Sequence, residues 1–467
     1  MQFTEGPVGK TLFLFTLPTL ASSILQSLNA SINAAWVGRL LGERALSASA
    51  NANALLFFLF STTFGLGMAA TVLVGQSLGA RDMETAKRTI GTGFAFFALV
   101  SLVVATLGIA FAPQVLTLMH TPPDALPLAS SYLRVIFIAL PGMVLYMFVI
   151  MALRGAGDAK TPAVSFLVAA VLDCVLNPLL IRGVGPIPAF GIAGSALSTA
   201  IAQWTGVLGV IVWMYKSKHF LRFARGEGHY LRVDRRILRT LIVKGVPMGL
   251  SIAVMSSSMI VIISLVNRFG SHVTAAYGAC FQLWNYIQMP AIAVGTAVSS
   301  MAAQNVGAKR WDRVSLIARA GIVFNVILTS VLVVLVSVMS HTAFALFLGS
   351  DSDALPIAQH INAMVSWSFV MLGISFVLSS VVRATGAVGV PLAILFVALW
   401  VVRIPFAYAL APTFQAEAIW WSFPLGSVVS LLLSILYYRF GNWREARMLD
   451  RGRGPVDGEA AAVEPAG

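Results

Sequence analysis

The sequence is poor in charge. Only 10% of its 467 residues are Asp, Glu, Lys or Arg, whereas 58% are hydrophobic. Soluble domains carry roughly 25% charged residues. A water-soluble protein of this length could not cover its surface with so few charges. The shortage excludes a soluble globular protein and indicates a chain embedded in a membrane.

Cysteine is also scarce, and the common catalytic motifs are missing. The two cysteines, Cys174 and Cys280, lie inside apolar stretches, which offers neither a disulfide framework nor a metal site. The sequence has no zinc-binding His/Glu pattern, no Gly-Lys phosphate loop and no nucleophile elbow. We therefore expect no enzyme activity, no metal and no cofactor. Any active transport must be driven by an ion gradient.

Long apolar stretches dominate what is present. A membrane-spanning helix needs about 20 mostly apolar residues. Twelve stretches qualify: 11–38, 46–74, 89–118, 127–153, 161–182, 190–215, 241–267, 275–302, 314–340, 356–382, 389–411 and 417–438. The sequence therefore predicts an all-α membrane protein with twelve transmembrane helices.

The second half of the chain repeats the first at a spacing of 229 residues. Equivalent pairs are Pro18 and Pro247, Arg39 and Arg268, Arg154 and Arg383, Gly157 and Gly386, and Pro162 and Pro391. The GQSLGAR stretch at 75–81 answers AQNVGAK at 303–309, one residue out of step. Each half holds six segments, an even number, so both halves insert the same way up. We expect two six-helix lobes related by a pseudo-two-fold along the membrane normal.

Four regions follow from this pattern. They are an N-terminal six-helix lobe (1–215), a basic cytoplasmic connector (216–240), a C-terminal six-helix lobe (241–440) and a cytoplasmic tail (441–467) whose end is disordered. We place 25 of the 31 Lys and Arg residues on one side, most densely in the connector. The positive-inside rule then predicts a multi-pass protein of the bacterial plasma membrane with both termini in the cytoplasm. The net charge of +13 reflects topology and lipid contact, not nucleic-acid binding.

Only one of the 18 acidic residues, Asp173, lies in the middle of an apolar segment. An ionisable side chain is costly there and marks a functional site. Asn177 follows one helical turn later on the same face. We predict that Asp173 and Asn177 form a proton-coupling site. The alternative is a structural aspartate held by neighbouring helices.

Other polar side chains within the segments are candidates for a substrate cavity. In the first half they are Gln26, Asn29, Asn33, Ser195 and Thr199, and in the second half Gln282, Asn285, Gln288 and Arg403. Hydrogen bonding between helices is the competing explanation. Arg403 needs a partner, which can be a carbonyl, a substrate or Glu417. Pro18 and Pro247 should kink the first helix of each lobe and act as hinges or as passive bends.

Together these motifs resemble the MATE (multidrug and toxic compound extrusion) family over roughly residues 8–440. The matching stretches are VGRLLGERALSA (37–48), GQSLGAR (75–81), LRGAGDAKTP (153–162), LDCVLNPLLI (172–181), GIAGSALSTAIAQ (191–203) and AAQNVGAKR (302–310). The resemblance implies two six-helix lobes, a central V-shaped cavity, a monomer, and antiport of organic cations or metabolites against protons or sodium.

The sequence departs from the family pattern in three ways. Asn33 stands where the family often has an aspartate, and the order Asp173 then Asn177 reverses a common Asn-then-Asp pattern. Met255 stands where the sodium-coupled, NorM-like branch has a glutamate. The sequence is therefore more similar to the DinF-like branch, for which the resemblance implies proton coupling.

We accordingly expect a secondary antiporter that exports organic cations, drugs or metabolites from the cytoplasm in exchange for protons. Its partners would be a small-molecule substrate and membrane lipid. A sodium-coupled exporter remains an alternative, as does a lipid-linked saccharide flippase, although a flippase would need several cavity Arg or Lys residues. An integral membrane enzyme and a passive channel are further alternatives.

Overall fold

The computed structural model describes residues 3–118, 126–185, 188–349 and 351–449. Within these ranges the chain is helical and contains no strand. The disorder predicted for the end of the tail concerns residues 454–467, which lie outside the described residues.

Six helices form the first lobe: α1 (Val8–Leu41), α2 (Glu43–Gly79), α3 (Met83–Leu118), α4 (Leu126–Gly155), α5 (Lys160–Arg182) and α6 (Ile192–Lys216). A connector with the short helix η1 (Glu227–Leu231) follows. The second lobe contains α7 (Arg235–Val266), η2 (Asn267–Phe269), α8 (Ser271–Gly307), α9 (Trp311–Val338), α10 (Ser340–Leu348), α11 (Ala354–Val365), α12 (Ser368–Arg383), α13 (Gly389–Phe396), η3 (Val397–Arg403), α14 (Ile404–Phe414) and α15 (Ala416–Phe440).

Each of the twelve predicted segments coincides with one helix or one run of helices. In the described part of the chain, nine helices are long and apolar enough to cross a membrane, and α11 and α12 make a tenth span with a 46° bend. The helices α2 and α8, 37 residues each, complete the twelve. The predicted all-α, twelve-helix class is confirmed.

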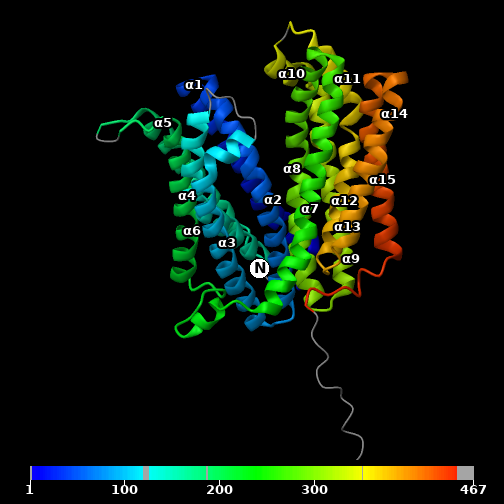
Figure 1. Ribbon diagram of the computed structural model, residues 1–467. Helices are drawn as coiled ribbons and strands as arrows, with labels where there is room; N and C mark the ends of the chain where they lie inside the picture. The colour runs from blue at the N-terminus through cyan, green and yellow to red at the C-terminus, as the bar shows by residue number, and fades with distance from the viewer. Residues whose placement is uncertain (1–2, 119–125, 186–187, 350, 450–467) are drawn as a thin grey trace, which may run out of the picture.

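The two lobes stand side by side (Figure 1), and α2 and α8 join them. Helix α2 of the first lobe packs against α7 and α8, and α8 of the second lobe packs against α1. This reciprocal arrangement is what a pseudo-two-fold between the lobes requires.

The repeat is visible in backbone detail where α2 and α8 end. The C-cap residues Ala80 and Ala308 have the same dihedral angles, φ −79° and ψ 0°. Arg81 and Lys309 follow, each with φ 58°, a left-handed conformation uncommon for residues with a side chain. The same turn is therefore built twice, in the GQSLGAR and AQNVGAK stretches of the repeat.

The ends of α2 and α8 touch backbone to backbone across the lobe interface. A Cβ on Gly79 would lie 1.8 Å from the carbonyl oxygen of Gln304, and one on Gly307 would lie 2.0 Å from that of Gln76. Only glycine allows helices to approach this closely. The lobes are therefore in direct contact at the end of the molecule that carries the N-terminus.

The first described residues also contact the second lobe. Phe3 is fully buried, and its backbone N–H donates to Gln304 Oε1 at 3.2 Å. The guanidinium of Arg313 on α9 donates to the carbonyl oxygens of Phe3, Glu5 and Gly6. At the other end of the chain, Trp443 packs edge-on against Trp311 of α9. Both ends of the described chain therefore lie at the same end of the bundle.

The connector is docked on α3. Lys87 pairs with Glu227 at 2.6 Å, and the backbone N–H of Asp234 donates to Thr92 Oγ1. Asp234 also caps α7, because its side chain accepts hydrogen bonds from the N–H groups of Arg236 and Ile237. This cap starts α7 at Arg235, earlier than the residue 241 expected from hydropathy alone.

A pH-dependent release of the connector is expected at His219. Its Nε2 lies 3.9 Å from Asp158 Oδ2, and its Nδ1 accepts the N–H of Leu221. Burial lowers the pKa of His219 below its usual 6.5, and nearby Asp158 offsets part of this effect. A lowered pKa means that docking is most stable above about pH 6.5 and weakens as the pH falls, because the released ring binds a proton more readily.

Trypsin cleavage of the connector measures this release. From about pH 7.5 to about pH 5.5, the cleavage rate of the wild type relative to His219→Gln should rise several-fold. The variant cannot titrate at this position and corrects for the pH dependence of the protease. A ratio that stays constant would show that His219 does not control docking.

Candidate functional site

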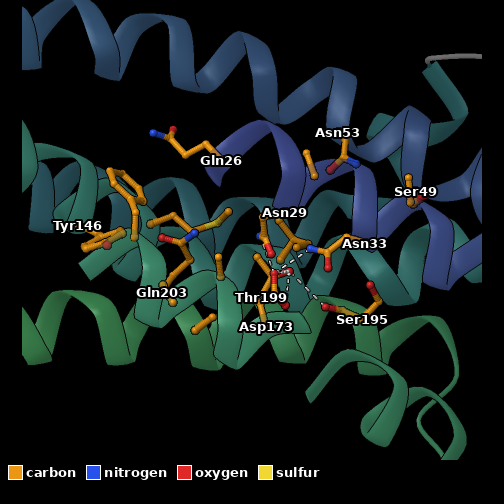
Figure 2. Close-up of a pocket in the computed structure, with 18 of the residues that line it drawn as sticks. Gln26, Asn29, Asn33, Ser49, Asn53, Tyr146, Asp173, Ser195, Thr199 and Gln203 are labelled. Atoms are coloured by element: carbon orange, nitrogen blue, oxygen red, sulfur yellow. Dashed lines mark hydrogen bonds between the residues drawn. The ribbon is translucent and has the colours of Figure 1, made fainter. Parts of the chain in front are cut away.

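A cavity of about 490 Å³ lies within the first lobe (Figure 2). Its polar lining residues are Gln26, Asn29, Asn33, Ser49, Asn53, Asp173, Ser195, Thr199 and Gln203. Apolar and aromatic side chains such as Tyr132, Met147 and Phe166 form the rest of its wall. Cavities of this size, mostly apolar with a few converging polar groups, are typical of small-molecule sites.

Asp173 is the only acidic residue among those lining the cavity, and its side chain is 1% exposed. Its Oδ2 accepts hydrogen bonds from Asn29 Nδ2 at 2.9 Å and from Asn33 Nδ2 at 2.7 Å. Its Oδ1 accepts a short hydrogen bond from Ser198 Oγ. Thr199 Oγ1 lies 3.5 Å from both oxygens, at the limit of a hydrogen bond.

The local sequence explains why these groups meet. Asn29 and Asn33 are four residues apart, so both point from one face of α1 toward α5. On the opposite side, Gly194 lets α6 approach α5, since a Cβ there would lie 2.4 Å from the carbonyl oxygen of Leu180. This approach brings Ser198 against Asp173. The aspartate is therefore held between α1 and α6.

The side chain of Asn177 donates to Asn33 and not to Asp173, although the two residues lie one turn apart. It is fully buried, and its Nδ2 donates to Asn33 Oδ1 at 2.7 Å. Asn33 thus donates to the carboxylate and accepts from Asn177. The predicted pair is linked through a side chain of α1.

The remaining first-lobe candidates surround this centre. Gln26 is exposed along the cavity and donates to the carbonyl oxygen of Ser22 in its own helix. Ser195 and Thr199 line the same cavity, and Thr199 also donates to the carbonyl oxygen of Ser195. All five polar residues singled out for substrate contact in the first half therefore lie around one cavity.

Sequence reasoning missed Ser198, Asn53 and Gln203. Ser198 lies between Ser195 and Thr199 in the GSALSTA stretch, and a serine on a helix face next to a buried acid is the available signal. Asn53 and Gln203 lie inside apolar windows, where an amide is commonly explained by a hydrogen bond between helices. Their place in the cavity depends on tertiary packing.

The cavity has no positively charged lining residue among those described, so every hydrogen-bond donor to Asp173 is neutral. A carboxylate in this setting can take a proton or a cation. Hard metal cations prefer several oxygen ligands, whereas the two amides present their nitrogens to Asp173. In the described residues, no group of three or more His, Cys, Asp or Glu could hold a metal ion.

The second-lobe candidates are not brought together with these residues. Gln288 and Arg403 border a separate cavity of about 40 Å³, and Gln282 and Asn285 are exposed on α8. Arg403 does not pair with Glu417, since that carboxylate accepts a hydrogen bond from His360 at 2.8 Å. The candidate cavity residues are thus divided between the two lobes.

Pro18 and Pro247 lie inside α1 and α7. In each helix the serine four residues later, Ser22 or Ser251, donates its hydroxyl to the proline carbonyl oxygen, at 2.8 and 3.0 Å. A hydroxyl bonded this way often bends a helix, and proline removes a backbone donor nearby. A proline and a serine that together weaken the backbone hydrogen bonding of the helix therefore occur at equivalent places in both lobes.

Comparison with known proteins adds independent findings. The family model described as MatE matches residues 18–179 and 247–409, and the two matches start 229 residues apart. The probable multidrug resistance protein YoeA of Bacillus subtilis is 38% identical, with 94% of this chain and 95% of the relative covered. YpnP of the same organism, also named a probable multidrug resistance protein, is 32% identical, with coverage of 96% and 98%.

Solved structures agree with the fold. A crystal structure of a MATE protein in complex with MaD3S superposes with a TM-score of 0.86 at 19% identity, covering 94% of this chain and 97% of the other. The matched regions comprise both lobes.

Proposed function

The chain belongs to the MATE family of multidrug efflux transporters, and from this premise we propose that it exports organic cations, drugs or metabolites from the cytoplasm in exchange for protons. The observation that carries the proton assignment is the bonding of Asp173. This buried carboxylate faces a cavity large enough for a drug-sized molecule and accepts hydrogen bonds from neutral groups only.

The mechanism uses two states of Asp173. In the ionised state it accepts hydrogen bonds from Asn29, Asn33 and Ser198, and its negative charge attracts a cationic substrate into the first-lobe cavity. A proton arriving from outside neutralises the carboxyl and turns one acceptor oxygen into a donor. The hydrogen bonds to α1 must then rearrange, and the cation loses its counter-charge.

Movement of α1 connects this exchange to the shape of the cavity. Asn29 and Asn33 lie in the part of α1 that follows Pro18, so bending at Pro18 would let this part move while the preceding part stays packed. Pro247 occupies the equivalent place in α7. We propose that both prolines serve as hinges and that the lobes rock about the pseudo-two-fold to give alternating access.

We further propose a monomer in the bacterial plasma membrane with both termini in the cytoplasm. Two observations support this orientation: the ends of the described chain lie at the same end of the bundle, and the basic connector lies there too (Figure 1). The coupling ion is the only small species required besides the substrate, and no cofactor takes part. The lobe contacts through Gly79 and Gly307 would then close the cytoplasmic side.

Efflux from proteoliposomes tests the function directly. The protein is reconstituted with a fluorescent lipophilic cation, and a pH gradient or a sodium gradient of equal size is imposed. We expect export with the pH gradient alone and none with sodium alone. Export driven by sodium would replace the proton by sodium in the scheme. Absence of cation export with either gradient would reject the proposal and favour a metabolite or lipid-linked cargo.

A further inference from the structure

The second lobe contains a buried charged group, two of whose nitrogens have no hydrogen-bond partner within the described residues. Arg403 is 5% exposed, and its guanidinium carbon lies 3.4 Å from the ring centre of Phe423. Its Nε and Nη2 atoms are buried and have no hydrogen-bond partner within the described residues. These two nitrogens form one edge of the guanidinium, with parallel N–H groups. This edge matches the two oxygens of a carboxylate.

The surroundings fit an anion. Arg403 lines a cavity of about 40 Å³ together with Gln288, Ser427, Ser430 and several apolar residues, and none of its lining residues is acidic. One water needs roughly 10–15 Å³ of such volume. The cavity therefore has room for one small group beside Arg403, but not for a drug-sized molecule.

Arg403 also occupies the place in its lobe that Asp173 occupies in the first. The two family matches start 229 residues apart, but their ends, at 179 and 409, are one residue further apart than that. The π-helix η3, which ends at Arg403, provides this extra residue of the second lobe. Allowing for that residue, Arg403 is the equivalent of Asp173. The second lobe thus has a buried positive charge where the first has a negative one.

Contacts with the next helix agree with this equivalence. Helices α6 and α15 both begin after a residue with nearly the same dihedral angles, Gly191 (φ 57°, ψ −133°) and Gln415 (φ 52°, ψ −134°). Thr199 and Phe423 each follow these residues by eight positions. Thr199 lies against Asp173, and Phe423 lies against Arg403.

We propose that this cavity is an anion site of the second lobe that receives one carboxylate, either as a small free anion or as the carboxylate of a transported zwitterion. Binding of the anion does not depend on proton coupling at Asp173. The assignment of the bound carboxylate to the cargo rests on the proposed export function. The protein would then handle a cation in one lobe and an anionic group in the other.

Thermal unfolding of the purified full chain in potassium acetate tests the site. Ionic strength is held constant with the potassium salt of a bulky sulfonate. The wild type and Asp173→Asn should each show a saturable rise in Tm on the order of 2 °C. Arg403→Gln should show none, and neither should Ser430→Met, which keeps the guanidinium but fills the cavity. No rise in the wild type, or an equal rise in Ser430→Met, would overturn the proposal even if Arg403→Gln fails to fold.

A matched pair of cargoes identifies the source of the carboxylate. A fluorescent rhodamine with a free carboxylate is compared with its methyl ester in the proteoliposome assay. If cargo supplies the anion, Arg403→Gln should lose export of the acid roughly tenfold more than export of the ester. If a free anion occupies the site, acetate should change export of both dyes alike. Asp173→Asn keeps the acetate-dependent Tm rise while losing export, so the two proposals fail separately.

Discussion

Asp173→Asn should remove export driven by a pH gradient while leaving the fold intact. The amide has nearly the same shape and can still accept from Ser198, but it cannot take up and release a proton. Coupling between two sites typically changes affinity 5–150-fold, so we expect export to fall on the order of 10–100-fold. The measurement is the initial efflux rate in proteoliposomes with a fixed pH gradient.

Two further variants serve as controls for this result. Asp351→Asn makes the same chemical change at an exposed position of the second lobe and should retain full export. Ser198→Ala removes one hydrogen bond to the carboxylate but keeps the titratable group, so its export should lie between those of Asp173→Asn and the wild type. Full proton-driven export by Asp173→Asn would exclude this residue as the coupling site.

Gly79→Ala and Gly307→Ala should each open the contact between α2 and α8. The new methyl groups would lie 1.8 and 2.0 Å from backbone carbonyl oxygens, which cannot move aside as a flexible side chain can. Overpacking of this kind costs about 1–3 kcal/mol. A cost of that size on one conformation shifts its population by roughly 5–150-fold. The state with the lobes in contact at this end should therefore become less populated by this factor.

Distances between spin labels on Met83 and Arg310, in a chain lacking Cys174 and Cys280, would report the change. We expect a longer distance in both variants and slower export, because alternating access needs both states. Gly278→Ala is the matched control in α8, since its Cβ meets no atom within 4 Å. Unchanged label distances in Gly79→Ala would contradict the role assigned to this glycine contact.

Much of the fold could be predicted from the sequence because membrane helices are recognised by the length of their apolar stretches. Most of the windows are shorter than the helices, as for 11–38 against Val8–Leu41, since a helix continues past its apolar part. The π-helix that ends at Arg403 and the 46° bend between α11 and α12 could not be predicted. Neither has a distinctive local sequence.

Only the first-lobe part of the candidate site was predictable from the sequence. A lone acid at Asp173 and a polar stripe at Asn29 and Asn33 are conspicuous against an apolar background, and the structure brings them into contact. Ser198 was missed because a serine in a membrane helix is ordinary. The separation of Arg403 from the first-lobe cavity depends on which faces the two lobes present, and this is a tertiary property that periodicity does not contain.

The N-terminal residues limit how far the lobes can separate. Residues 3–6 are bound by Arg313 of α9, yet Val8 begins α1 of the other lobe. Five residues, even fully extended, cover at most about 18 Å. While the Phe3 bonds hold, the segment is a tether whose length sets the widest opening at this end. Lengthening or shortening it would reset the size of the entrance without altering either lobe.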